Sequence, residues 1–168
     1  MVSKTDLAWL GGIIDGEGSV TIFRHTEKNG KVKLCPTVGI TNTNPKIISR
    51  CLKIIGELGV TVHIQERWTD SEKYATCWQV ISRNTTTIKT ILEGVRPYLY
   101  GKGQVADYVL SFIESRWTQN GKGQAKRYTE YEHRLADSSM AFNKRGVSKI
   151  LTDYTQYAEN IRKYKVPR

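Results

Sequence analysis

Two acidic residues, Asp15 and Glu17, lie on either side of Gly16 near the beginning of the chain. Apolar residues recur at three- and four-residue spacing over positions 7–14, which predicts a helix that ends at about Asp15. An anion at that end of a helix is destabilised unless a cation or a hydrogen-bond donor meets it. A divalent cation such as Mg²⁺, which prefers oxygen ligands, would satisfy both acids. On charge alone, two solvated acids in an exposed turn are the favoured alternative.

Glycines surround these acids at positions that a helix normally avoids. Gly11 and Gly12 lie inside the predicted helix, where each costs about 1 kcal/mol relative to alanine. Gly16 follows Gly12 at four-residue spacing, which allows two helices to approach each other closely. A helix-ending turn would explain Gly16 and Gly18 but not the two interior glycines. The spacing therefore favours a helix that packs tightly against another backbone.

The elements that must position these residues follow in a regular order. The pattern predicts a strand from Ser19, a turn at 27–30, a strand over 31–41 and a helix that Asn44 caps and Gly59 ends. Strands at about 60–68 and 74–82, and helices to about 95 and over 105–117, come next. A loop at 119–124 precedes helices at about 129–140 and 147–164.

This order predicts an α+β fold with an αββαββα core. Two hairpins, each preceded by a helix, favour a four-stranded antiparallel, saddle-like sheet with helices on one face. We expect one domain over 1–168, with its core at about 5–118 and a C-terminal helical extension at about 119–168. The free face of the sheet would be polar and basic, and it suits a DNA groove about as well as it suits plain solvent.

Composition limits the class of protein further. The chain has 168 residues, a net charge of +10 and a pI of about 9.6, which favours a nucleic-acid partner. It has no apolar run of about 20 residues and no signal-peptide pattern at its start, so we expect an intracellular protein without a membrane partner. The three cysteines lack metal-ligand spacing, which argues against a zinc site and against disulfides.

The segment Leu10–Gly18 resembles the motif of the LAGLIDADG homing endonucleases, with Gly11 and Gly16 replacing the two alanines and Glu17 the last aspartate. The chain contains one copy of this motif, as the short homodimeric members do. The resemblance implies a site-specific, Mg²⁺-dependent endonuclease that cuts both strands of a long, near-palindromic DNA site. Mn²⁺ or Ca²⁺ would substitute in binding. The partners would be double-stranded DNA and a second copy of the chain, with no small-molecule substrate.

The resemblance also implies roles for single residues. Glu17 and the carbonyl of Gly16 would bind metal. Asn42, Lys46 and Lys102 match further catalytic positions by placement, although Asn42 stands where family members commonly have Gln. Lys102 follows a Pro-aromatic-Leu stretch like the one that precedes a catalytic lysine in the family. The residues that would line the dimer interface are Gly11, Gly12, Asp15 and Gly16.

DNA contacts are expected from the two hairpins and from a basic loop. The first hairpin would contribute Ser19, Thr21, Arg24, His25, Lys31, Lys33, Thr37 and Thr41. The second would contribute Thr61, His63, Gln65, Arg67, Lys73 and Gln79, and the loop Lys122, Lys126 and Arg127.

The protein would then belong to an intron- or intein-associated mobile element, with intron homing as its biological role. A non-cleaving DNA- or RNA-binding protein, such as an intron-splicing maturase of the same fold, is the alternative.

Overall fold

The computed structural model describes residues 2–67, 76–119 and 127–143. Its elements are α1 (Lys4–Glu17), β1 (Gly18–Thr26), β2 (Val32–Asn42), α2 (Pro45–Glu57), β3 (His63–Arg67), β4 (Cys77–Ser82), α3 (Thr85–Val95), the short 3₁₀ helix η1 (Arg96–Tyr98), α4 (Gly103–Gln119) and α5 (Glu130–Phe142). This order confirms the predicted αββαββα core and the additional helix near 129–140. The predicted helix at 147–164 lies outside the described residues.

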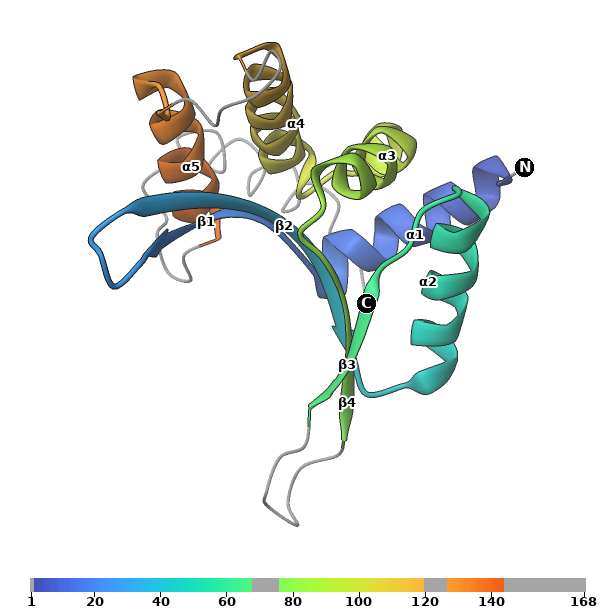
Figure 1. The fold of residues 1–168 in the computed structure, drawn as a ribbon. Coiled ribbons are helices and arrows are strands. Elements are labelled where there is room, and N and C mark those ends of the chain that lie inside the picture. Colours follow the sequence, from blue (N-terminus) through green and yellow to red (C-terminus); the bar gives the residue numbers. More distant parts are fainter. Residues whose placement is uncertain (1, 68–75, 120–126, 144–168) are drawn as a thin grey trace, which may run out of the picture.

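The four strands form one antiparallel sheet in the order β1-β2-β4-β3. Figure 1 shows the sheet curving so that the described helices lie on its convex side and none of them covers its concave side. The two edge strands are β1 and β3. The fold is therefore the predicted α+β arrangement with helices on one face of the sheet.

The helices begin where their capping residues predict. Ser3 accepts a hydrogen bond from Asp6 N at 3.1 Å at the start of α1, and Asn44 accepts one from Lys46 N at 2.9 Å at the start of α2. Pro45 occupies the first position of α2, where its missing N–H costs nothing. The core between helices and sheet is made of aliphatic side chains, among them Leu10 and Ile14 of α1.

Helix α5 is attached both to α4 and to the edge strand β1. Glu132 is fully buried at its start, where it accepts hydrogen bonds from Thr129 N and the Ser115 hydroxyl and pairs with Arg116 at 3.5 Å. At the other end, the hydroxyl of Ser139 accepts a bond from the backbone N–H of Ile22 at 2.9 Å.

Asn143 completes this attachment by donating to the carbonyl of Val20 at 2.8 Å. These bonds satisfy outward-facing backbone groups of β1, which would otherwise be open to pairing with another chain. Among the described residues, no helix is long and apolar enough to cross a membrane.

Candidate active site

Glu17 stands at the corner where α1 meets the sheet. It is the last residue of α1, and its side chain is exposed. The strand begins at once with Gly18, where an added Cβ would lie 2.6 Å from the carbonyl oxygen of Ile14. Only glycine allows so abrupt a change from helix to strand. Because Gly18 pairs with Ile40, Glu17 lies at the end of the ladder at which Asn42 also ends β2.

Asp15 has a different environment, although it lies only two residues earlier. Its carboxylate accepts hydrogen bonds from the backbone N–H groups of Tyr100 at 2.7 Å, Gly101 at 3.0 Å and Lys102 at 2.8 Å. The carboxylate of Asp15 is thus satisfied by donors from its own chain, and its predicted place at a dimer interface stays a prediction. The end of α1 requires hydrogen-bond donors, and the backbone N–H groups of the loop between η1 and α4 supply them.

Lys102 is the cation that this loop brings to the end of α1. Its side chain is half-buried, and its ammonium donates to the main-chain carbonyl of Asp15. Burial lowers the pKa of Lys102 below its ordinary value, and the negative charges of Asp15 and Glu17 oppose that decrease. The structure thus places the predicted catalytic lysine within the electrostatic influence of the predicted catalytic acid.

Asn42 and Lys46 are joined to each other through a capping residue. The side-chain oxygen of Asn42 accepts a hydrogen bond from Asn44 N at 2.8 Å, and that of Asn44 accepts one from Lys46 N. Lys46 itself is exposed in the first turn of α2. Within the described part of the chain, no hydrogen bond or ion pair joins Asn42 or Lys46 to Glu17. Their predicted catalytic roles remain predictions.

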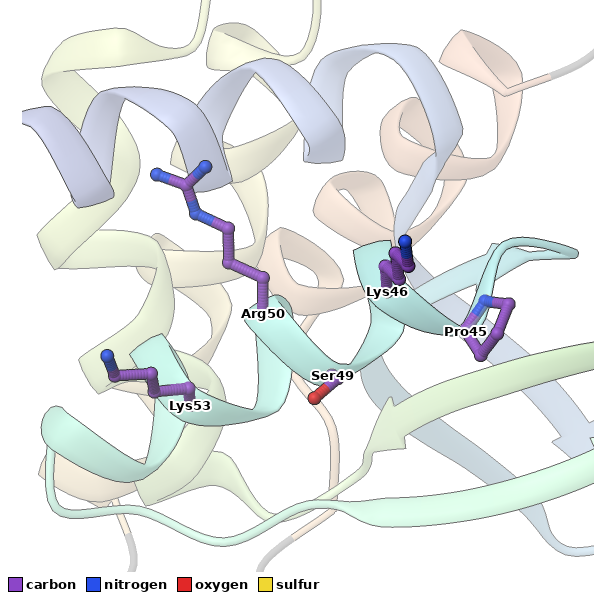
Figure 2. A pocket seen from close by; sticks show the side chains of 5 residues that line it. All are labelled: Pro45, Lys46, Ser49, Arg50 and Lys53. Atoms are coloured by element: carbon purple, nitrogen blue, oxygen red, sulfur yellow. The ribbon is translucent and has the colours of Figure 1, made fainter.

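Lys46 also lines a shallow hollow on the outer side of α2. Figure 2 shows this hollow, whose lining residues are Pro45, Lys46, Ser49, Arg50 and Lys53. Arg50 is held there, with its guanidinium 4.3 Å from the ring centroid of Trp9 and 3.3 Å from Asp6. The hollow is therefore cationic, and α2 presents a basic face beside α1.

The three predicted interface glycines of α1 have two different environments. Gly11 is buried, and an added Cβ would lie 2.9 Å from the Cβ of Tyr98. Its close neighbour is thus η1 of the same chain, and a role of Gly11 at a dimer interface stays a prediction. Gly12 and Gly16 are exposed, and an added Cβ at either position would meet nothing within 4 Å. These two glycines leave the outer side of α1 free for a close neighbour.

The concave face of the sheet presents polar side chains in two neighbouring rows. Strand register places Ser19, Gly39, Ile81 and His63 in one row across the four strands, and Thr41, Gln79 and Gln65 in the next. Among these, Ser19, His63 and Gln65 are exposed, as is His25 nearer the turn of the first hairpin. Gln79 donates to the hydroxyl of Thr41 at 3.3 Å, so these two half-buried side chains hold each other.

Three of the predicted DNA contacts are not exposed on the concave face of the sheet. Thr21 and Thr37 are cross-strand partners that are only 3% and 2% exposed, so their side chains do not reach the surface. Arg24 lies opposite Leu34 on the helix-covered side of the hairpin, because side chains alternate between the faces of a strand. Its guanidinium is 2.8 Å from Asp137 in α5. It therefore fastens the hairpin to α5 instead of facing the concave side.

The remaining predicted DNA contacts lie at the ends of the strands, in turns or outside the described residues. Lys31, Lys33, Thr61 and Arg127 are exposed, and Lys33 forms an ion pair with Glu27. Arg67 is the last residue of β3. Lys73, Lys122 and Lys126 lie outside the described residues.

The hydrogen bonds of Asp15 to residues 100–102 were missed by the sequence interpretation. The available signal was the pair of glycines, Gly101 and Gly103, on either side of Lys102, which indicates a loop but not its partner. The second part of the signal was an acid at a helix end, because a carboxylate there needs hydrogen-bond donors. Nothing in the spacing of the two segments, more than 80 residues apart, connects them.

Known proteins resemble this chain in both sequence and fold. Residues 4–96 match the family of LAGLIDADG-like domains. The structure of I-Vdi141I, an archaeal intron-encoded homing endonuclease complexed with DNA, is 17% identical, with a TM-score of 0.63 over 95% of this chain and 96% of that one. The homing endonuclease I-TnaI is 16% identical, with a TM-score of 0.59 over 96% of this chain and 100% of its own.

A third structure is that of I-CvuI with the I-CreI target in 2 mM Mg, in which the DNA is not cleaved. It is 17% identical, with a TM-score of 0.54 over 82% of this chain and 96% of that one. Among curated proteins, none matches the chain. Because the matched family segment covers more than half of the 168 residues, and the solved structures share the fold, the chain belongs to the LAGLIDADG-like domain family.

Proposed function

We propose that this protein is a site-specific, Mg²⁺-dependent DNA endonuclease that works as a homodimer and cuts both strands of a long, near-palindromic site. The observation that carries the proposal is the end of α1, where the exposed acid Glu17 lies close enough to Lys102 to influence its pKa. An intron- or intein-associated mobile element is the setting that this activity suits.

The donor set at this corner fits a hard divalent cation that is shared between two chains and DNA. Among the described residues, no group of three or more His, Cys, Asp or Glu side chains could hold a metal ion. Mg²⁺ is commonly bound through one or two carboxylates together with substrate phosphates, so one Glu17 from each of two copies suffices. The main-chain carbonyl of Gly16 would add an oxygen. When bound, the cation neutralises charge on the phosphate and activates a water.

The chain's own residues provide the remaining requirements of phosphodiester hydrolysis. The Lys102 ammonium supplies positive charge beside the acid, where negative charge accumulates as the phosphate is attacked. Asn42 and Lys46 lie at the neighbouring strand end and helix start, where they would orient water and the DNA backbone. Because Lys102 is partly buried, its charge is screened less from the phosphate than a fully solvated charge would be.

A second copy is required because one chain supplies one such acid. Gly12 and Gly16 leave the outer side of α1 open to close helix packing. A twofold axis along this side would bring the two Glu17 side chains together, and it would match a DNA site made of two related halves. I-Vdi141I and I-TnaI, whose chains are matched over 96% and 100% of their length, have the extent of a single such unit.

The concave face of the sheet is the proposed DNA surface. Its exposed residues from the predicted set are Ser19, His25, Lys31, Lys33, Thr61, His63 and Gln65, with Thr41 and Gln79 half-buried between them. Lysine, arginine and glutamine side chains can read base edges in the major groove, which is wide enough for a two-stranded ribbon. Solved DNA complexes of I-Vdi141I and I-CvuI support this choice of partner.

Cleavage of a randomised duplex library tests the proposal. Wild-type protein with Mg²⁺ should cut a discrete set of sequences on both strands, and Glu17→Gln should bind those sequences without cutting them. Glu66→Gln, an exposed acid of β3, is the matched control and should cut as the wild type does. If the wild type binds duplexes but cuts none of them, the protein is a DNA-binding member of the fold and the nuclease proposal is wrong. A monomeric mass in solution would contradict the shared site.

A further inference from the structure

The loop that contains Lys102 is fastened to α1 through one residue. One oxygen of the Asp15 carboxylate accepts from the N–H groups of Tyr100 and Gly101, and the other accepts from that of Lys102. The Lys102 ammonium returns to α1 by donating to the Asp15 carbonyl. Both the backbone and the charged tip of the lysine are therefore fixed on the same residue.

This attachment determines where Lys102 lies relative to Glu17. Asp15 and Glu17 belong to the last turn of α1, so helix geometry fixes the backbone of one relative to that of the other. A loop that is bonded to Asp15 must then keep a set position relative to Glu17. Without the carboxylate, the three N–H groups would lose the acceptor that they share.

The elements on either side of the loop have attachments of their own. Before it, η1 packs against Gly11 through Tyr98. After it, α4 is bound to Arg96 by Asp107, with two hydrogen bonds of 2.6 and 2.7 Å. These contacts hold η1 and α4 without help from Asp15. The carboxylate therefore acts on residues 100–102 themselves.

We infer that Asp15 is a positioning residue, which sets the place of the Lys102 ammonium beside Glu17 without touching DNA. The consequence for cleavage rests on the proposed function, whereas the geometry rests on the hydrogen bonds of this chain. This positioning role requires a carboxylate, with two acceptor oxygens. In an asparagine, the amide nitrogen would face either the N–H of Lys102 or those of Tyr100 and Gly101, and a donor would oppose a donor.

A double-mutant cycle tests the inference. Single-turnover cleavage is measured for Asp15→Asn, Lys102→Met and the combined variant on a duplex that the wild type cuts, with DNA affinity measured separately in Ca²⁺. Asp15→Asn should slow cleavage about 100-fold, the size of effect that a displacement of about 1 Å can cause, while affinity stays unchanged. The combined variant should cut no more slowly than Lys102→Met. If the rate losses of the two single variants multiply in the combined variant, the inference is overturned, because Asp15 then acts independently of Lys102.

Two further variants separate positioning from loss of folding. Asp6→Asn changes an aspartate on the same helix that pairs with Arg50 far from the loop, and it should cut at the wild-type rate. Asp15→Glu retains both acceptor oxygens and should regain part of the rate that Asn loses. If Asp15→Asn does not fold, Asp15→Glu replaces it in the cycle. The loss of cleavage rate that Asp15→Glu causes must then disappear when Lys102 is already methionine.

A readout without DNA distinguishes failure of this inference from failure of the nuclease proposal. The rate at which an acylating reagent modifies Lys102, followed by mass spectrometry, should rise at least several-fold in Asp15→Asn and stay unchanged in Asp6→Asn. An unchanged rate in Asp15→Asn would overturn the positioning role. If the wild type cuts no duplex while Lys102 becomes more reactive, the hydrogen-bonded geometry stands and the proposed activity is what fails.

Discussion

The two sides of α1 use the same spacing for opposite purposes. On the inner side, Gly11 and Asp15 are four residues apart, and both contact the segment 98–102 of the same chain. On the outer side, Gly12 and Gly16 are also four residues apart, and an added Cβ at either would meet nothing within 4 Å. A shift of one residue turns the side chain by about 100°, which is enough to exchange an internal contact for an open surface.

The motif contains one acid with a structural role, Asp15, and one that is available for chemistry, Glu17. Asp15 on the inner side has three backbone donors, whereas Glu17 at the end of the helix is exposed. A satisfied carboxylate stabilises the fold, and an exposed one is available to a ligand. The predictions below test whether this division holds.

The largest effect on stability is expected at Asp15. Asp15→Asn should lower the free energy of unfolding by about 1.5–3 kcal/mol, because a charged acceptor of several hydrogen bonds is lost. Urea unfolding followed by circular dichroism at a fixed protein concentration measures this change. Asp6→Asn, at a half-buried position in the first turn of the same helix, should cost less. Equal losses in the two variants would show that Asp15 is an ordinary surface acid.

The inner glycine should be less tolerant than the outer one. Gly11→Ala places a methyl group 2.9 Å from the Cβ of Tyr98, so α1 or η1 must move, at a cost of about 1–3 kcal/mol. The same unfolding experiment measures the loss, with Gly56→Ala in α2, where nothing lies within 4 Å of an added Cβ, as the control. If Gly11→Ala is as stable as Gly56→Ala, the close approach of η1 does not constrain this position.

Much of the fold could be predicted from local patterns, because each pattern has a local cause. Asn44 and Pro45 predicted the start of α2, and the structure confirms both as its cap and first residue. Alternation in 31–41 predicted β2, which runs from Val32 to Asn42. Strand register then decides which face a side chain occupies. The pairing of Arg24 with Leu34 places Arg24 on the helix-covered side, and local alternation alone does not reveal that pairing.

The candidate site was predictable only in its parts. Glu17 and Lys102 were identified from motif resemblance, and the structure brings them together at the end of α1. The contact of Asp15 with residues 100–102 links segments that are distant in sequence, and no local periodicity contains such a link. The same holds for Gly11, because a glycine pattern shows that some backbone approaches closely but not whose backbone it is.

The outer glycine should affect assembly more than folding. Gly12→Ala removes an interior helix glycine, so helix propensity alone should stabilise the chain by up to about 1 kcal/mol. If two copies pack along this side, the added methyl groups should also raise the dimer dissociation constant about tenfold, which corresponds to about 1.4 kcal/mol. Sedimentation equilibrium measures the constant. An unchanged constant would place the dimer contact elsewhere on the chain.

The smallest effect is expected at Glu17, and its sign is the informative part. Without a divalent cation, an anion at the C-terminal end of a helix is unfavourable, so Glu17→Gln in EDTA should raise the free energy of unfolding by about 0.3–1 kcal/mol at low ionic strength. Salt should reduce this gain, because exposed charges are screened. Glu66→Gln in β3, away from any helix end, should show no gain. A loss of stability in Glu17→Gln would mean that the attraction between Glu17 and Lys102 outweighs the penalty at the helix end, and the division between a structural and a chemical acid would then fail.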